Sequence, residues 1–176
     1  MSVLKIITIP DSRLKNKSLD VDKYDKELKQ KIKDLYDTLY YSENGIGLAA
    51  PQVGIFERIV VIDLKEDSKS KPLTLINPKI INKSNEKFIN QEGCLSIPGY
   101  YADVERSMEI EYEWFDENGN KQTATSQGLL SICIQHEVDH LNGVLFIDYL
   151  SGLKKKMALD KVLKFNKKNK TSKNDN

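Results

Sequence analysis

The sequence is poor in cysteine and histidine and has no long apolar run. Its 176 residues include two cysteines and two histidines. Two cysteines are too few for a disulfide framework, so a reducing cytoplasm is the expected compartment. No stretch approaches the roughly 18 apolar residues that a membrane span needs. The start of the chain lacks the small-residue cleavage site of a secretory signal, so we expect neither secretion nor a membrane partner.

The chain has an ordinary folded composition with an uneven distribution of charge. Hydrophobic residues make up 39% and charged residues 30%, and the length suits one domain with one core. Residues 151–176 contain nine Lys and two Asp, a net charge of +7, whereas the preceding 150 residues have a net charge of −6. A basic segment on an acidic body can contact an anionic partner such as RNA. A solvated helix with a frayed end explains the same charge, so both interpretations stay open.

Apolar periodicity predicts helices toward both ends of the chain and strands between them. We expect helices at 25–41, 128–141 and 153–165, and strands at 58–64, 73–82, 104–115 and 121–126. The last two strands form a hairpin around the turn at 116–119. The predicted class is α+β, with mainly antiparallel β-sheets around a central helix and a further helix near each terminus. We predict a single domain at 1–165, followed by a basic, disordered tail at 166–176.

The most informative segment is His136-Glu137-Val138-Asp139-His140, which matches the pattern H-E-x-x-H. Residues four positions apart lie on one face of a helix, so the two imidazoles can bind one metal ion together. Glu137 lies beside them, within reach of a water at that metal. A surface helix with two ordinary histidines is the competing interpretation. It is disfavoured because the flanking residues are apolar and because both histidines of the chain fall in this motif.

A hydrolytic metal site usually has three protein ligands and one open position. The usual third ligands of this motif are absent, because position 146 is Phe instead of a third His and no Glu follows Glu137. Asp148 and Asp160 remain candidates, but the two cysteines are better ones.

Cys94 is the stronger of the two cysteine candidates. Cys133 precedes His140 by seven residues on the same expected helix, which is about 10.5 Å along the axis at about 1.5 Å per residue. A short thiol cannot converge with His140 over that distance, so we expect Cys133 to pack beside the site. Cys94 comes from a Gly- and Pro-containing segment at 91–98 and can approach from another direction. We take Cys94 with His136 and His140 as the metal ligands.

Three separated segments together resemble the motifs of the peptide deformylases. They are Gly45-Ile46-Gly47-Leu48-Ala49-Ala50-Pro51-Gln52-Val53-Gly54, Glu92-Gly93-Cys94-Leu95-Ser96 and Gln135-His136-Glu137-Val138-Asp139-His140. Their order and spacing match the family, and the similarity covers about residues 3–160. The resemblance implies a metal-dependent hydrolase that removes the formyl group from the N-terminal formyl-methionine of newly made polypeptides and releases formate. Residues 1–165 would then be the catalytic domain.

The first segment also fits a dinucleotide-binding fingerprint superficially, as Gly45-x-Gly47-x-x-Ala50. That fingerprint needs a strand before it and a helix after it. Here a helix is expected before it, and Pro51 follows directly, so a dinucleotide site is disfavoured. The resemblance implies instead that Gly45 and Gly47 let the backbone approach the substrate closely.

The ligand set and the resemblance together predict a mechanism. A divalent metal lowers the pKa of a bound water from about 15.7 toward about 7, and this water attacks the formyl carbon. Glu137 acts as general base and then as general acid. The resemblance implies that the Gln52 side chain and the Leu95 backbone N–H stabilise the oxyanion. It also implies one Fe²⁺ per chain, with Zn²⁺, Ni²⁺ or Co²⁺ able to substitute, although Cys-His-His is equally a good zinc set.

Substrate recognition follows only from the resemblance. Ile46, Leu129, Ile132 and Cys133 match positions that line the family's methionine pocket, although any buried helix presents similar side chains. The chain has Tyr101 where some members of the family have Arg, which leaves contacts to the downstream peptide open.

A further ion pair is expected next to the metal ligands. Arg106 is predicted to pair with Glu92 and to brace the loop that carries Cys94. Such a contact would orient the ligands without touching the substrate.

The resemblance implies formyl-methionyl nascent peptides as partners and therefore a bacterial cytoplasm, where chains start with formyl-methionine. The basic segment Lys154–Lys170 is a candidate for contact with the ribosome, and no DNA partner is expected. Three alternatives remain: a metallopeptidase that cuts internal bonds, a binding module with a structural zinc, and an inactive relative. The missing third His or downstream Glu argues against the first alternative. The lack of a fourth ligand argues against the second, and the presence of every expected catalytic residue argues against the third.

Overall fold

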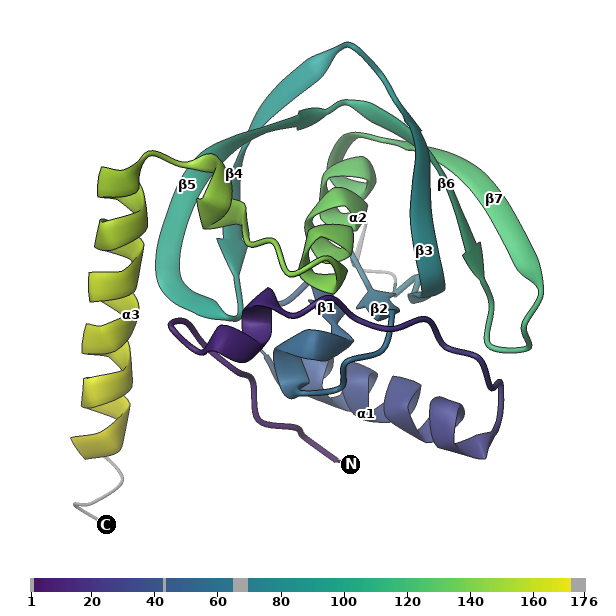
Figure 1. The fold of residues 1–176 in the computed structure, drawn as a ribbon, viewed down its shortest axis with the longest axis horizontal. Coiled ribbons are helices and arrows are strands. Elements are labelled where there is room, and N and C mark those ends of the chain that lie inside the picture. The colour runs from purple at the N-terminus through teal and green to yellow at the C-terminus, as the bar shows by residue number, and fades with distance from the viewer. Residues whose placement is uncertain (1, 43, 65–69, 172–176) are drawn as a thin grey trace.

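The computed structural model describes residues 2–42, 44–64 and 70–171. Its strands form two antiparallel sheets, and the helix α2 (Gly128–Leu141) lies between them (Figure 1). The helix α1 (Lys26–Tyr41) packs beside the larger sheet, and α3 (Gly152–Thr171) lies at the outer side of the smaller one. This confirms the predicted α+β class with a helix near each terminus.

The larger sheet has five strands in the order β1-β2-β3-β6-β7. Its strands are β1 (Gly47–Ala49), β2 (Ile59–Ile62), β3 (Leu73–Lys83), β6 (Glu109–Phe115) and β7 (Lys121–Gln127). The predicted hairpin is confirmed, because β6 and β7 pair from Glu109 opposite Gln127 to Phe115 opposite Lys121. Ile110 and Tyr112 of β6 face α2 in one apolar cluster, as their period of two predicts.

The prediction of one long strand at 104–115 is wrong. The chain bends at Met108, so that β5 (Ile97–Ser107) pairs with β4 (Lys87–Cys94) in a separate two-stranded sheet. The cause lies at Ser107, whose backbone carbonyl accepts hydrogen bonds from Ser131 and Gln135 of α2 at 3.1 and 2.9 Å. Because these bonds tie the strand to the helix, the strand changes from one sheet to the other at this point.

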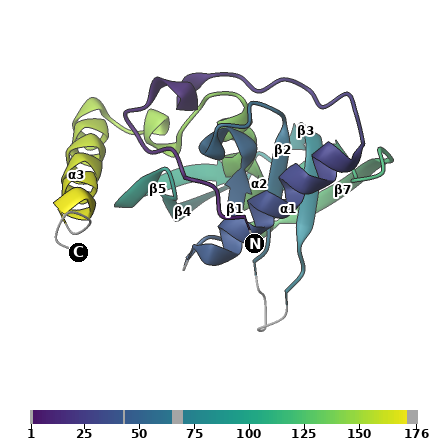
Figure 2. The ribbon, with the colours of Figure 1, turned by 90° about the horizontal axis from the view of Figure 1, so that it is seen from below.

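The helix α1 begins and packs as its sequence indicates. The Asp25 side chain caps it by accepting hydrogen bonds from the backbone N–H groups of Glu27 and Leu28. Its apolar face lies across β1 and β2 (Figure 2). The buried residues on that face are Leu28, Ile32, Leu35 and Leu39.

The C-terminal helix is longer than predicted. The helix α3 continues past Phe165 to Thr171, so the prediction of disorder is wrong for residues 166–171, whereas residues 172–176 lie outside the described residues. Ala158 and Val162 anchor it in the core, and Asn166 donates a hydrogen bond to Thr8 at 3.1 Å. The described helices include none that is both long and apolar enough to cross a membrane.

Candidate metal centre and active site

The two histidines of α2 meet the end of β4. His136 and His140 lie one turn apart, and the three donor atoms of Cys94, His136 and His140 lie within 4.8 Å of one another. The Cys94 sulfur lies 3.2 Å from Nε2 of His140. Among the described residues this cluster includes neither Cys133 nor the aspartates considered as alternatives. The structure therefore brings together the three ligands that the sequence predicts.

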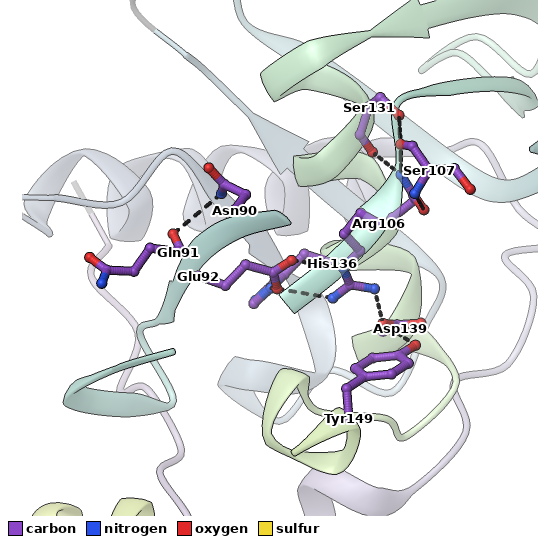
Figure 3. Close-up of polar contacts among 10 residues, drawn as sticks. Asn90, Gln91, Glu92, Arg106, Ser107, Ser131, His136, Asp139 and Tyr149 are labelled. Carbon is purple, nitrogen blue, oxygen red and sulfur yellow. Dashed lines mark hydrogen bonds and ion pairs between the residues drawn. The ribbon is translucent and has the colours of Figure 1, made fainter. Parts of the chain in front are cut away.

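The Glu92 carboxylate contacts the Nδ1 side of the His136 ring (Figure 3). Its Oε2 lies 2.8 Å from Nδ1 of His136. Arg106 donates to both carboxylate oxygens of Glu92, from Nε at 2.7 Å and from Nη2 at 3.0 Å, as the sequence predicts. Burial acts to raise the pKa of Glu92, but the bonds from Arg106 and His136 outweigh it and lower the pKa to about 2. A carboxylate at this place accepts a hydrogen bond from Nδ1–H and leaves Nε2 free to bind a cation.

Asp139 and Tyr149 extend this network, and the sequence reasoning did not find them. Asp139 Oδ2 accepts from Nη1 of Arg106 at 2.6 Å and from the Tyr149 hydroxyl at 2.9 Å. The guanidinium carbon of Arg106 also lies 4.9 Å from the centre of the Tyr149 ring. Asp139 stands inside the H-E-x-x-H motif at a position that the motif leaves open. Tyr149 carries no local signal, because its partners come from other elements.

Glu137 faces the site from the same helix turn. Its side chain is buried, and its Oε2 has no hydrogen-bond partner in the described part of the chain. Burial raises the pKa of this carboxyl to about 7. Burial also lowers the pKa of His140 well below its usual value, so that imidazole is neutral, the form that binds metals. An unpartnered buried carboxylate next to three converging donors indicates a position for a water or a substrate group.

Gln52 points its amide nitrogen into the same space. Its Oε1 accepts a hydrogen bond from the Ala49 backbone N–H at 2.9 Å, which fixes the orientation of the amide. Its Nε2 lies 3.4 Å from the Cys94 sulfur and 3.1 Å from the Ser96 hydroxyl. Leu95, the other predicted oxyanion donor, lies in the turn between Cys94 and Ser96 and lines the cavity.

A cavity of about 550 Å³ opens beside these residues. All six predicted substrate residues line it: Gly45, Ile46, Gly47, Leu129, Ile132 and Cys133. Ile132 and Cys133 are buried, whereas Ile46 and Leu129 are exposed at its mouth. Further lining residues, which the sequence reasoning did not assign to the pocket, are Asn44, Asn90, Gln91, Gly93, Ile97, Pro98 and Tyr100. Tyr101 also lines it, with its ring packed against Gly93.

The donor set fits a divalent transition metal. A thiol and two imidazoles are ligands that such ions prefer, and hydrolytic sites commonly hold them through three protein groups. The unpartnered Glu137 oxygen beside the ligands fits the open position of a catalytic rather than a structural site.

Comparison with known proteins decides the family. The model of the polypeptide deformylase family matches residues 3–156. The chain belongs to the peptide deformylase family. Peptide deformylase 1 of Vibrio vulnificus is 52% identical over 167 residues, which cover 95% of this chain and 98% of that protein. Peptide deformylase of Rhizobium meliloti is 44% identical, covering 93% of this chain and 94% of the relative.

Solved deformylase structures share the fold. The peptide deformylase of Ehrlichia chaffeensis in complex with actinonin has a TM-score of 0.89 and 43% identity, over 93% of this chain and 98% of that one. The deformylase of Legionella pneumophila also gives 0.89, with 40% identity over 94% and 96% of the two chains. The chain is therefore an enzyme of the deformylase family, as its three motifs predict.

Proposed function

We propose that this enzyme hydrolyses the formyl amide at the N-terminal formyl-methionine of newly made polypeptides. Water adds to the formyl carbon, the bond between that carbon and the methionine nitrogen breaks, and formate and a free amine leave. The observation that carries the proposal is the meeting of Cys94, His136 and His140 with the unpartnered Glu137 carboxylate beside a cavity of about 550 Å³, in a chain of the deformylase family.

Cys94, His136 and His140 would hold one divalent cation per chain. We propose Fe²⁺ as the resident ion, with Zn²⁺, Ni²⁺ or Co²⁺ able to take its place, because sulfur and imidazole donors suit all four. When bound, such an ion supplies Lewis acidity, which polarises a carbonyl and makes a water more acidic.

Glu137 moves the proton in this proposal. A carboxyl group whose pKa lies near neutrality can both accept and release a proton at physiological pH. Burial raises the pKa of Glu137 to about 7 in the unligated site. Glu137 takes a proton from the attacking water and delivers it to the methionine nitrogen as the amide bond breaks.

Gln52 and Leu95 stabilise the negative charge that develops on the formyl oxygen. The bond from Ala49 to Oε1 keeps the Gln52 Nε2 hydrogens directed toward Cys94, so this donor is oriented before the substrate arrives. We propose the Leu95 backbone N–H, next to Cys94 in the chain, as the second donor.

The methionine side chain enters the apolar part of the cavity. Ile132 and Cys133 of α2 form its buried wall, and Ile46 and Leu129 flank its mouth. Gly45 and Gly47 keep that side free of side chains. The flexible thioether chain of methionine suits such a narrow apolar slot.

Formate release from a formyl-Met tripeptide tests the proposal. The protein is purified without oxygen and compared with its Glu137→Ala variant and with an unformylated peptide. Formate release by the wild type but not by the Glu137→Ala variant supports the reaction and the role of Glu137. Cleavage of the unformylated peptide, with no formate, would instead identify a peptidase.

We further propose that residues 1–165 act as the catalytic domain in a bacterial cytoplasm and that α3 contacts the ribosome. The helix is anchored through Ala158 and Val162, while Lys154, Lys156 and Lys164 are exposed. Cosedimentation with ribosomes at low and high salt tests this, and a truncation after Phe165 separates the end of the helix from its first part. Unchanged binding after reversal of the three lysines to Glu would contradict it.

A further inference from the structure

Tyr149 touches the network behind the metal ligands in two ways. It lies at the end of the 3₁₀ helix η4 (Phe146–Tyr149), outside the three motifs of the family. Its hydroxyl donates to Asp139 at 2.9 Å, and its ring faces the Arg106 guanidinium at 4.9 Å (Figure 3). The ring contacts Arg106, the side chain that binds Glu92, directly, and the hydroxyl reaches Arg106 through Asp139.

Arg106 is shared between two carboxylates. Nε and Nη2 bind Glu92, whereas Nη1 binds Asp139 at 2.6 Å. The Arg106 and Glu92 side chains are 4% and 3% exposed, and that of Asp139 is 18% exposed. With so little solvent, the two anions compete for a single cation. The Tyr149 hydroxyl is a second donor to Asp139, so Asp139 draws the guanidinium of Arg106 less strongly away from Glu92. The Tyr149 ring against the guanidinium also restricts its rotation.

The orientation of the Arg106 guanidinium determines the orientation of His136, a proposed metal ligand. Two parallel bonds from Arg106 fix the plane of the Glu92 carboxylate, and that carboxylate accepts from Nδ1 of His136. A partner of this kind sets the orientation of a metal-binding imidazole. A chain of contacts therefore runs from Tyr149 through Asp139 and Arg106 to Glu92 and His136.

We propose that Tyr149 is a positioning residue for the metal centre, acting through Asp139 and Arg106 on the Glu92 carboxylate that orients His136. The inference rests on the proposed metal site and extends it to a residue from a separate element. Tyr149 is not among the residues that line the cavity, so its effect should appear in cation binding rather than in substrate binding.

Titration of the metal-free protein with Co²⁺ tests this proposal directly. The sulfur-to-cobalt charge-transfer absorption reports binding at Cys94, and a competing chelator gives the dissociation constant. Tyr149→Phe removes the hydroxyl but keeps the ring, and Tyr149→Leu removes both. Tyr41→Phe is the matched control, because Tyr41 is 72% exposed on α1. The melting temperature of each metal-free protein measures any general loss of structure.

We expect Tyr149→Phe to weaken Co²⁺ binding several-fold, less than the about 10-fold lower limit for direct partners of metal ligands, because Tyr149 acts through three intervening residues. Tyr149→Leu should weaken it more, and the metal-free melting temperature of Tyr149→Phe should match that of the control. In an Asp139→Asn background, Tyr149→Phe should have little further effect, because the contact acts through Asp139.

Two results would overturn the inference while leaving the proposed function intact. One is an unchanged Co²⁺ dissociation constant in Tyr149→Phe. The other is that Tyr149→Phe weakens Co²⁺ binding equally in the wild-type and the Asp139→Asn backgrounds. By contrast, a wild-type protein that shows no thiolate absorption with Co²⁺ would overturn the metal site itself.

Discussion

A Cβ atom built on Gly47 would lie 2.6 Å from Oε1 of Glu137 and 2.9 Å from the Cys133 sulfur. Both distances are shorter than real contacts allow, so the missing side chain of Gly47 makes room for the proposed general base. The strand β1 can approach α2 this closely only with glycine at this position. The second glycine of the G-x-G in the first motif therefore has a steric cause within the protein.

Gly47→Ala should displace Glu137 and lower kcat for formate release by about 10²-fold, because a small misplacement of a catalytic group has effects of this size. Gly152→Ala is the matched control, since no atom lies within 4 Å of its added Cβ. Formate release by both variants, measured at equal metal content, checks the prediction. Equal kcat values would mean that Glu137 tolerates the shift.

Gln52→Glu should keep the fold and lose the oxyanion donor. The new carboxylate can still accept from the Ala49 N–H, but it places a negative charge beside Cys94. We expect kcat to fall about 10²–10³-fold, as for the loss of one oxyanion donor. Gln122→Glu, on the exposed part of β7, controls for the added charge. A variant with wild-type kcat would remove Gln52 from the mechanism.

Oxygen should inactivate the enzyme if iron is the resident metal. A ferrous ion bound to the Cys94 thiolate is open to oxidation, whereas zinc has no redox chemistry. Anaerobic purification should therefore yield more activity per bound metal than aerobic purification, and reloading with Ni²⁺ or Co²⁺ should abolish the difference. Equal activity from both preparations would argue against iron.

The sequence predicted the helix α2 and the juxtaposition of its two candidate ligands because both depend on local spacing. The range 128–141 matches α2, and the four-residue interval of the motif places His136 and His140 together. Cys94 followed from elimination and from the resemblance. Its approach depends on the hairpin of β4 and β5, which local patterns did not predict.

Long-range partners account for what the sequence did not predict. Residues 104–115 alternate like one strand, but the bonds of Ser107 to α2 divide them between two sheets. The first residues of β4 are exposed and show no apolar alternation. In the part of α3 beyond Phe165, Asn166 bonds to Thr8, 158 residues away in the sequence, a contact that local patterns do not indicate.

Arg106→Ala should destabilise the protein strongly, because it leaves Glu92 buried without its cation. Breaking one partner of a buried pair typically costs about 3–5 kcal/mol, and the Arg106 and Glu92 side chains are 4% and 3% exposed. Urea unfolding of the metal-free protein measures the loss. Arg13→Ala, which removes an exposed pair with Asp11, should cost much less. Similar losses of unfolding free energy in the two variants would show that the buried pair contributes no more to stability than the exposed one.

Asp148 should make stability depend on pH at the acid end. Burial acts to raise its pKa, but bonds from Lys15 and from the Leu145 N–H lower it below the ordinary value of 3.8. Because the folded-state pKa is depressed, the stabilisation is present above the unfolded-state pKa and is lost as the pH falls through the folded-state value.

Asp148→Asn keeps an acceptor for the Leu145 N–H and removes the charge that pairs with Lys15. It should lower the free energy of unfolding at pH 7 by about 1 kcal/mol or less, because the carboxylate is partly exposed. The gap should begin to narrow as the pH falls to about 4, the ordinary pKa of the unfolded carboxyl, and should close only below the depressed folded-state pKa, where the wild-type carboxyl is protonated as well. Asp160→Asn, at an exposed position of α3, provides the control. Urea unfolding between pH 3 and pH 7 measures the difference, and a constant gap over this range would show that the Asp148 charge does not contribute.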